Sequence, residues 1–201
     1  MARPKEYTDE EILSTAGQVL LEHGVKVATS VIAAQIGLSS AALFHRFGSK
    51  RNLIIQALIP RPPEMGLVES GPDERAIQDQ LADIGHLIVA HMQAMAPRVA
   101  ALRNAGVSIE ELFKHFEKPP PVVMFQSMTA WFERAIASGR VRQASAEHCA
   151  MAFLGSLHGR HFFGEVLCIP ITTSREDYIQ SAACLFSLGC ASAQERQGGM
   201  Q

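Results

Sequence analysis

Residues 39–50 combine polar, cationic and apolar side chains at the spacing of one short helix. Leu43 and Phe47 lie four residues apart, so a helix here would have one buried face. The remaining face would carry Ser40, Ala41, Phe44 and His45. Small and polar side chains let a helix approach base edges, and an alanine methyl can contact a thymine methyl. This face therefore favours hydrogen bonding and van der Waals contact with a DNA groove.

The segment before this helix has the pattern of a second short helix. Ile32 and Ile36 recur at helical spacing, and Thr29 or Ser30 is the expected N-cap. Gly37 can adopt a positive φ, so we predict that it ends this helix. Two short helices joined by such a turn form a helix-turn-helix, which can place its second helix in the major groove. An ordinary three-helix packing unit is the alternative, because caps and glycine stops occur in any helical protein.

Three further cap signals place the neighbouring helices. Ser39 is the expected N-cap of the second short helix, and Ser49 is the expected cap of a helix that begins at Lys50. Upstream, Thr8 and Glu11 have the spacing of a capping box, followed by a helical apolar stripe. The sequence therefore predicts a bracing helix, the helix-turn-helix and a following helix that ends near residue 60.

In these motifs the chain resembles the TetR/AcrR family of one-component transcriptional repressors. The resemblance rests on Ile32-Ala33-Ala34, Gly37-Leu38-Ser39, Leu43-Phe44-His45-Arg46-Phe47 and Ser49-Lys50-Arg51-Asn52-Leu53. Its specific motifs cover residues 8–58, and the rest is matched by length and helix pattern. It implies an all-α fold, with an N-terminal three-helix helix-turn-helix DNA-binding domain (1–60) and a larger helical ligand-binding and dimerisation domain (61–201).

The resemblance also implies roles for single residues. The positions where the family contacts phosphates hold Thr29, Ser39, Phe44 and Lys50. The positions where it approaches base edges hold Ser30, Ser40, Ala41 and His45. Phe44 departs from the pattern, because the family usually has a tyrosine whose hydroxyl reaches a phosphate. Ala42 stands where threonine is frequent, so we predict fewer side-chain phosphate contacts and a compensating DNA contact from Arg46.

Composition sets wide bounds on the function. The 201 residues are 47% hydrophobic and 19% charged, which indicates a globular chain. The formal net charge of −2 gives no sign by itself of a nucleic-acid binder. Positive charge gathers locally at residues 3–5 and 46–51. The polar start and the lack of a long apolar run predict a cytoplasmic protein with no membrane span. The four cysteines have neither CxxC nor metal-finger spacing, so buried free thiols are expected, with a redox sensor as the alternative.

Helix periodicity and breakers divide the rest of the chain. Pro and Gly residues predict a linker over 61–72. We expect a helix over 73–96 that Pro97 breaks or kinks, and Pro119-Pro120-Pro121 as the end of another short helix. The remaining expected helices are 99–105, 108–117, 122–138, 145–167 and 174–192. No strand pattern or internal repeat stands out.

The middle helices carry many methionine, aromatic and histidine side chains. Such side chains at helical spacing usually form a core, but they also adapt to varied apolar guests. The resemblance favours a pocket, because family members typically release DNA when a small molecule enters this domain. We predict that a small-molecule effector contacts His91, Met92, Met95, Met128, Trp131, Phe132, His158 and Phe162.

Other chemistry finds little support in the sequence. His158 and His161 lie three residues apart, but no carboxylate completes a metal set, so neither a metal nor a cofactor is expected. No nucleophile–base order, paired-carboxylate motif or phosphate-binding glycine loop is evident, and an enzyme is not expected.

The last two helices are rich in small and large apolar residues, and they resemble the pair that forms the family's four-helix dimer interface. An internal core pair within one subunit is the alternative. The combined interpretation is a repressor that binds a palindromic double-stranded DNA operator as a homodimer. The rival is a small-molecule binding or scavenging protein that does not use its helix-turn-helix.

Overall fold

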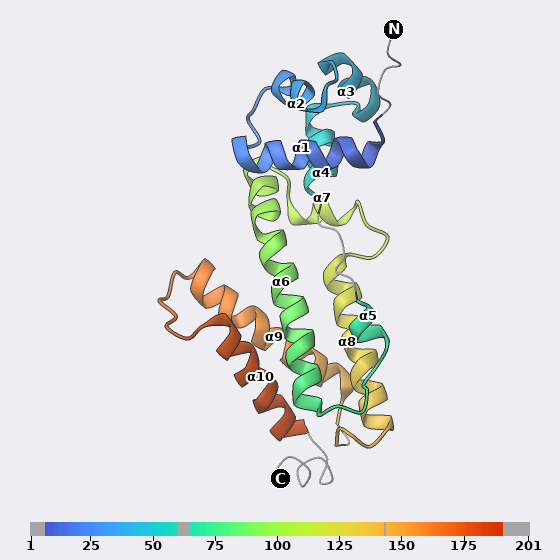
Figure 1. Cartoon of the computed structure of the whole chain (residues 1–201), viewed down its shortest axis with the longest axis vertical. Coiled ribbons are helices and arrows are strands. Elements are labelled where there is room, and N and C mark those ends of the chain that lie inside the picture. Colours follow the sequence, from blue (N-terminus) through green and yellow to red (C-terminus); the bar gives the residue numbers. More distant parts are fainter. Residues whose placement is uncertain (1–6, 60–64, 143, 191–201) are drawn as a thin grey trace. The chain divides into compact units, whose positions relative to one another are not determined.

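The computed structural model describes residues 7–59, 65–142 and 144–190. Every regular element of these residues is a helix (Figure 1). The elements are α1 (Asp9–His23), α2 (Thr29–Ile36), α3 (Ser40–Phe47), α4 (Lys50–Leu58), α5 (Gly66–Glu69), α6 (Ile77–Asn104), α7 (Ile109–Phe113), α8 (Pro120–Ala137), α9 (Ala146–His161), the π-helical turn η1 (Phe162–Val166) and α10 (Arg175–Cys190). The predicted all-α fold is confirmed.

The chain forms two compact units. The first comprises Met1–Arg61 with Gln93–Glu117, and the second comprises Pro62–Met92 with Lys118–Gln201. Helix α6 contributes its later part to the first unit and its earlier part to the second. The predicted domain boundary at residue 60 stays a prediction, because compactness alone does not define a functional domain.

The first unit is built on the predicted stripe of α1. Ile12, Ala16 and Leu20 are fully buried and pack with apolar residues of α2, α3 and α4. The capping box is present, because Thr8 accepts a hydrogen bond from the Glu11 amide and the Glu11 side chain accepts one from the Thr8 amide. The core of this unit thus holds the short helices α2 and α3 against α1.

Helix α2 ends as the sequence predicts but begins differently. Gly37 is left-handed with φ 83°, and its amide closes the end of α2 on the carbonyls of Ala33 and Ala34. The predicted N-cap of α2 is wrong: Ala28 occupies that position without a side-chain hydrogen bond, and Thr29 is the first helical residue. The hydroxyl of Thr29 therefore does not cap the helix.

The second unit has a core formed by α6, α8, α9 and α10. Phe132, Phe153 and Ile179 are buried in it, and Trp131 packs edge-on against Phe132 with ring centroids 5.2 Å apart. Gly85 allows α6 to approach its neighbours closely, because a Cβ there would lie 2.8 Å from Ile179 Cγ2. Close packing at this point leaves no room for a larger side chain at position 85.

Three expectations about breakers in the chain are wrong. The predicted linker contains α5, whose Val68 is fully buried, while residues 60–64 lie outside the described residues. Helix α6 begins at Ile77 and runs through Pro97 to Asn104 without a break, since a proline removes only one helical hydrogen bond and packing can offset that loss. The proline run begins α8 at Pro120, because a proline at the first turn needs no amide donor.

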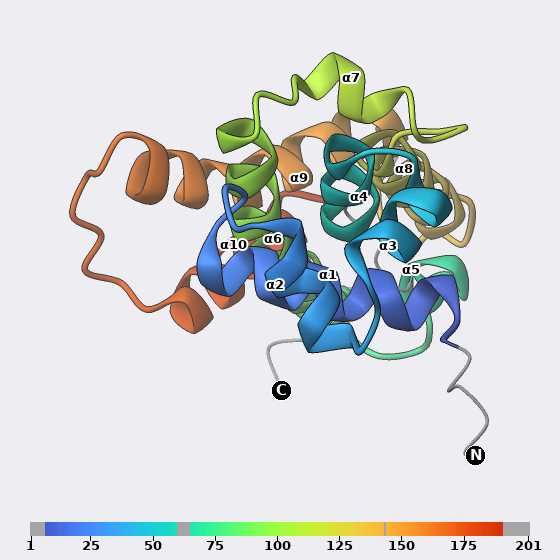
Figure 2. The same ribbon diagram turned by 90° about the horizontal axis from the view of Figure 1, so that it is seen from above.

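The two C-terminal helices begin where the sequence predicts, directly after Ser145 and Ser174. Helix α9 ends at His161 and continues as η1 to Val166, so the predicted helix changes from α-helical to π-helical near its end. Figures 1 and 2 both show an extended loop between η1 and α10. Along this stretch Phe162, Phe163 and Val166 are about half exposed.

Candidate DNA-binding surface

Helix α3 has the two faces that its sequence predicts. Leu43 and Phe47 are 1% and 4% exposed and belong to the core of the first unit. Ala41, Phe44 and His45 are exposed on the other side, and Ser40 is half-buried at the first turn. Phe44 exposes 42% of its surface, so its ring is accessible to a binding partner.

Two serine caps fix both ends of this surface. Ser39 accepts a hydrogen bond from the Ala42 amide at 3.1 Å, and Ser49 accepts one from the Asn52 amide at 3.1 Å. The Asn52 side-chain amide also donates to the Phe47 carbonyl at 2.9 Å, which joins the start of α4 to the end of α3. Lys50, half-buried at the first position of α4, follows directly on the capped turn.

The hydroxyl residues at the start of α2 are placed differently from the serine caps. Thr29 is half-buried and Ser30 is exposed, both within the first turn of α2. The amides at a helix N-terminus carry partial positive charge and can donate to a phosphate. Both residues therefore occupy a turn that is electrostatically suited to an anion.

Arg46 is engaged inside the protein. Its Nη1 donates to the Tyr7 carbonyl at 2.7 Å, and its Nε forms an ion pair with Asp9. The sequence places Arg46 in the positive cluster at residues 46–51 and predicts a DNA contact for it. The acid nearest in space lies 37 positions earlier in the chain, and neither periodicity nor capping patterns signal such a pairing.

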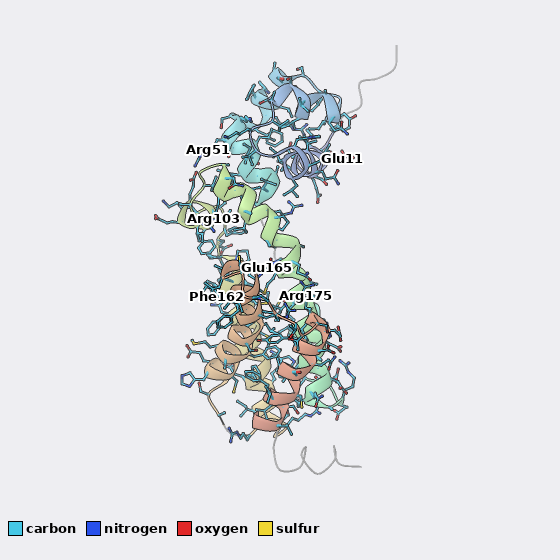
Figure 3. The ribbon with its side chains drawn as sticks, turned by 90° about the vertical axis from the view of Figure 1, so that its left-hand side faces the viewer. Glu11, Arg51, Arg103, Phe162, Glu165 and Arg175 are labelled. Carbon is cyan, nitrogen blue, oxygen red and sulfur yellow. The ribbon has the colours of Figure 1, made fainter. Side chains whose placement is uncertain are left out.

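Arg51 and Arg98 form hydrogen bonds between α4 and later parts of the first unit that the sequence did not predict. Arg51 on α4 bonds to Glu111 on α7 and to the carbonyls of Ala105 and Gly106, at the end of α6. Figure 3 labels Arg51 on the side of α4 next to this end. Arg98 donates from Nη1 to the Ala57 carbonyl at 3.0 Å. All these contacts lie within the first compact unit.

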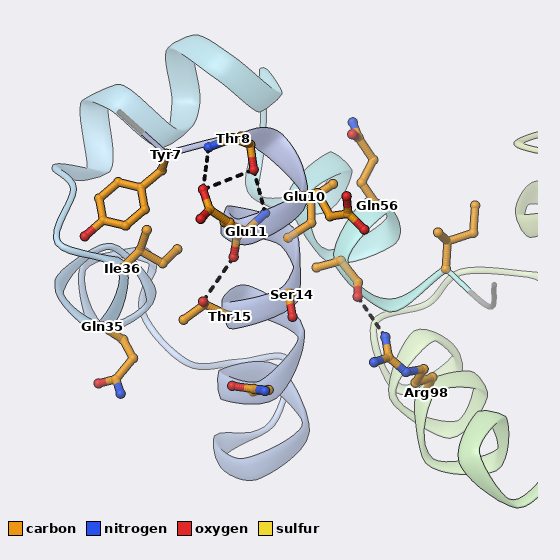
Figure 4. A pocket seen from close by; sticks show the side chains of 14 residues that line it. Tyr7, Thr8, Glu10, Glu11, Ser14, Thr15, Gln35, Ile36, Gln56 and Arg98 are labelled. Atoms are coloured by element: carbon orange, nitrogen blue, oxygen red, sulfur yellow. Dashed lines mark hydrogen bonds between the residues drawn. The ribbon is translucent and has the colours of Figure 1, made fainter. Parts of the chain in front are cut away.

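A surface pocket of about 840 Å³ lies around α1 in the first unit (Figure 4). Its lining is largely polar and includes Glu10, Glu11, Gln35, Gln56 and Arg98. None of the eight residues predicted to contact an effector lines it. This pocket therefore does not correspond to the apolar site that the sequence favours.

The structure brings together half of the predicted effector residues. Met128, Trp131 and Phe132 on α8 are fully buried in the core of the second unit, and Met92 on α6 packs against that core. His91, on the same helix, is half-buried, and the cost of burying its charge lowers its pKa.

The other predicted effector residues lie apart from this core. Met95 belongs to the first compact unit. His158 is an exposed residue on α9, and its Nδ1 lies 2.7 Å from the Leu154 carbonyl oxygen. Phe162 is 49% exposed in η1, where Figure 3 shows it near Glu165.

Two other kinds of site are absent from residues 7–59, 65–142 and 144–190. No helix in these ranges is both long enough and apolar enough to cross a bilayer. Likewise, His, Cys, Asp and Glu side chains of the described chain nowhere gather in a group of three or more that could hold a metal ion.

Many solved structures share this fold, and the three described here are 13–20% identical to this chain. A TetR-family transcriptional regulator from Mesorhizobium loti is 13% identical, with 91% of this chain and 96% of that chain covered and a TM-score of 0.71. A TetR regulator from Agrobacterium tumefaciens is 17% identical, with 94% and 96% covered and a TM-score of 0.70. The structure described as the SmeT–triclosan complex is 20% identical, with 92% of each chain covered and a TM-score of 0.60. Among curated protein sequences there is no significant match.

The fold and the α2–α3 surface define a helical protein with an N-terminal helix-turn-helix DNA-binding domain. Residues 12–57, which include this surface, match the family described as bacterial regulatory proteins, tetR family. The N-terminal segment thus matches the tetR family of bacterial regulators, and the chain as a whole has the fold of solved TetR-family transcriptional regulators.

Proposed function

We propose that this protein is a repressor that binds a palindromic operator as a homodimer and releases it when a small, largely apolar molecule binds. The observation that carries the DNA part is the exposed face of α3, where Ala41, Phe44 and His45 stand free while Leu43 and Phe47 are buried. In this proposal Ser30, Ser40, Ala41 and His45 approach base edges. Thr29, Ser39, Phe44 and Lys50 lie along the phosphates.

Phe44 has a specific place in this interface. Without a hydroxyl it cannot donate to a phosphate oxygen, so its exposed ring contributes van der Waals contact to sugar or to a thymine methyl. Lys50 then supplies the main cationic phosphate contact of this surface. Arg46 is already paired with Asp9, which lowers the number of charges available to DNA.

Exposed apolar residues on the C-terminal helices support the homodimer. Leu185 and Leu188 on α10 are 70% and 61% exposed, and Met151 on α9 is 57% exposed. Grouped large apolar side chains on one pair of helices indicate a surface that a partner covers. A two-fold dimer also presents two copies of α3 to half-sites about 34–36 Å apart, the spacing of one DNA turn.

The core of the second unit is the proposed effector site. Met92, Met128, Trp131 and Phe132 are apolar, and methionine side chains adapt to aromatic or aliphatic guests. A relative of the same fold was solved as a triclosan complex, and another is described as a flavonoid-responsive regulator. An effector can release DNA only if it binds more tightly to the conformation that does not fit the operator.

A mobility-shift titration tests this function against the alternative of a scavenging protein. Purified protein is mixed with genomic fragments from its own source at two salt concentrations. A repressor retards a few fragments selectively, and its affinity falls steeply with salt. A protein that retards all fragments equally, or none, is not an operator-binding repressor.

A further inference from the structure

Residues 7–9 contact the helix-turn-helix at two places, the turn between α2 and α3 and the end of α3. Arg46, in the last turn of α3, donates from Nη1 to the Tyr7 carbonyl at 2.7 Å. Its Nε donates to Asp9 Oδ1, in the first turn of α1. Because one rigid guanidinium makes both contacts, the end of α3 is tied to the start of α1 at two points.

The Tyr7 carbonyl is held in place by its neighbours. The Thr8 amide donates to Glu11 Oε2 at 2.9 Å, so the chain next to Tyr7 has one fixed conformation. The Tyr7 ring reaches the α2–α3 turn, where a Cβ on Gly37 would lie 3.3 Å from Tyr7 Oη. Figure 4 shows this ring beside Ile36 and the Thr8–Glu11 hydrogen bonds next to it.

We propose that Arg46 is a positioning residue for DNA recognition. With Asp9 and the Tyr7 carbonyl it forms a clamp, defined here as these three groups, that sets the orientation of α3. The proposal rests on the proposed operator binding and assigns the Arg46 charge to a contact within the protein. Arg46 therefore acts on base recognition through α3 and not through a phosphate.

The exposure of the clamp determines how large its effects are. The side chains of Arg46 and Asp9 are 40% and 62% exposed, and ion pairs so exposed contribute little to global stability. DNA recognition needs more precise positioning than folding does, because side chains that contact a ligand must be held to within about 0.5 Å of the productive geometry. Loss of the clamp should therefore reduce sequence discrimination more than it reduces the melting temperature.

A phosphate contact and a clamp predict opposite results for Asp9. If Arg46 bound a phosphate, Asp9→Asn would free the guanidinium, remove a negative charge near DNA and tighten binding. Under the same assumption, Arg46→Gln would remove one phosphate contact and so lower the slope of log affinity against log salt concentration by about one per contact. If Arg46 is part of the clamp, Asp9→Asn loosens α3 and weakens specific binding, and the salt slope stays as in the wild type.

The experiment is a double-mutant cycle on the full chain. Arg46→Gln, Asp9→Asn and the double variant are compared by their affinities for a selected operator and for an unrelated duplex, over a range of salt. Each single variant should reduce the specific-to-unspecific ratio about two- to fivefold per subunit, and the double variant should lose no more than either alone. Arg46→Lys should regain part of the ratio. Glu22→Gln, which removes an acid from the other end of α1, should leave the ratio unchanged.

Hydrogen exchange on the DNA-free protein gives an independent readout. The amides of Ser40–Phe47 should exchange faster in Arg46→Gln and in Asp9→Asn than in Glu22→Gln. Tighter operator binding by Asp9→Asn, additive losses, or unchanged exchange would each overturn the clamp. If the wild type discriminates no DNA sequence, the proposed function fails, and the exchange data alone then decide whether the clamp exists.

Discussion

Arg51 on α4 and Glu111 on α7 form a bidentate ion pair. Arg51 Nη2 lies 2.7 Å from Glu111 Oε2, and its Nε lies 3.2 Å from Oε1. The same guanidinium donates from Nη1 and Nη2 to the carbonyls of Ala105 and Gly106, each at 3.2 Å. Carbonyls at a helix end lack helical partners, so Arg51 both satisfies them and joins α4 to the corner between α6 and α7.

This pair predicts how stability depends on pH. The hydrogen bonds from Arg51 hold the pKa of Glu111 below its ordinary value of about 4.5. A carboxyl whose pKa is lower in the folded state stabilises the fold above its unfolded pKa, and this contribution is lost as the pH falls through the folded pKa. Thermal melting of Glu111→Gln should therefore depend less on pH below about 4.5 than melting of the wild type.

The neighbouring residue Glu110 supplies the control for this measurement. It is exposed and pairs with Lys114, the residue that follows α7, so Glu110→Gln should retain the wild-type pH profile. If Glu111→Gln and Glu110→Gln give the same profile, the Arg51–Glu111 pair does not contribute to stability in solution.

Gly17 marks the closest approach of α1 and α4. A Cβ at this position would lie 2.8 Å from the Ala57 carbonyl oxygen, the same oxygen that accepts from Arg98. Gly17→Ala should lower the free energy of unfolding by about 1–3 kcal/mol through this overlap. Urea unfolding followed by circular dichroism measures the change.

Gly66→Ala is the matched substitution, because its Cβ would meet nothing within 4 Å. We expect it to change the free energy of unfolding by less than about 0.5 kcal/mol. A Gly17→Ala protein as stable as the wild type would show that the two helices can separate without cost.

The sequence was most informative where a local signal decides the structure. Ser39, Gly37 and Ser49 were all predicted correctly, because N-caps and left-handed glycines act within one helical turn. The buried positions Leu43 and Phe47 followed from the helical period for the same reason. The all-α fold is the sum of such local signals.

Other features depend on partners that are distant in the sequence. Pro97 was expected to break or kink its helix, yet α6 runs through it without a break. The partners of Arg46 and Arg51 lie 37 and 60 positions away, at distances where one sequence carries no pairing signal. The assignment of residues to DNA binding and to effector binding stays a prediction, since only experiments with DNA or an effector can test it.

The proposed dimer interface predicts a change of oligomeric state. Leu185→Glu and Leu188→Glu place charges on the exposed face of α10, where a partner would have to bury them. The wild type should have twice the 21.9 kDa mass of the protomer by light scattering, and each variant should shift toward the protomer mass.

Val122→Glu is the control for the interface. Val122 is 42% exposed on α8, in the same compact unit but away from α10 in the sequence, so its variant should remain dimeric. Wild-type protein of protomer mass, or leucine variants that stay dimeric, would place the interface elsewhere.

Two methionines test the proposed effector site. Met128 is fully buried beside Trp131, whereas Met151 on α9 is 57% exposed. Met128→Ala should change the affinity for an effector by tenfold or more, about 1.4 kcal/mol, because it alters the apolar volume of the core. Met151→Ala should leave effector affinity unchanged.

Fluorescence gives the readout for this comparison. Trp131 is the only tryptophan of the chain, so its emission should change when an effector enters the core of the second unit. An effector that lowers operator affinity without changing Trp131 emission, and that binds Met128→Ala normally, binds at another site.

The central claim is that α3 selects the DNA sequence. Selection of binding sites from a pool of random duplexes by the wild type, His45→Ala and Lys50→Ala tests it most directly. The wild type should enrich a palindrome, and His45→Ala should relax the preference at one position in each half-site, at a cost of about 1–3 kcal/mol. Lys50→Ala should enrich the same sequence with lower affinity and a smaller salt slope. If the wild type and His45→Ala enrich the same sequence with equal preference at every position, His45 does not read a base. If the wild type enriches no sequence at all, the central claim is contradicted.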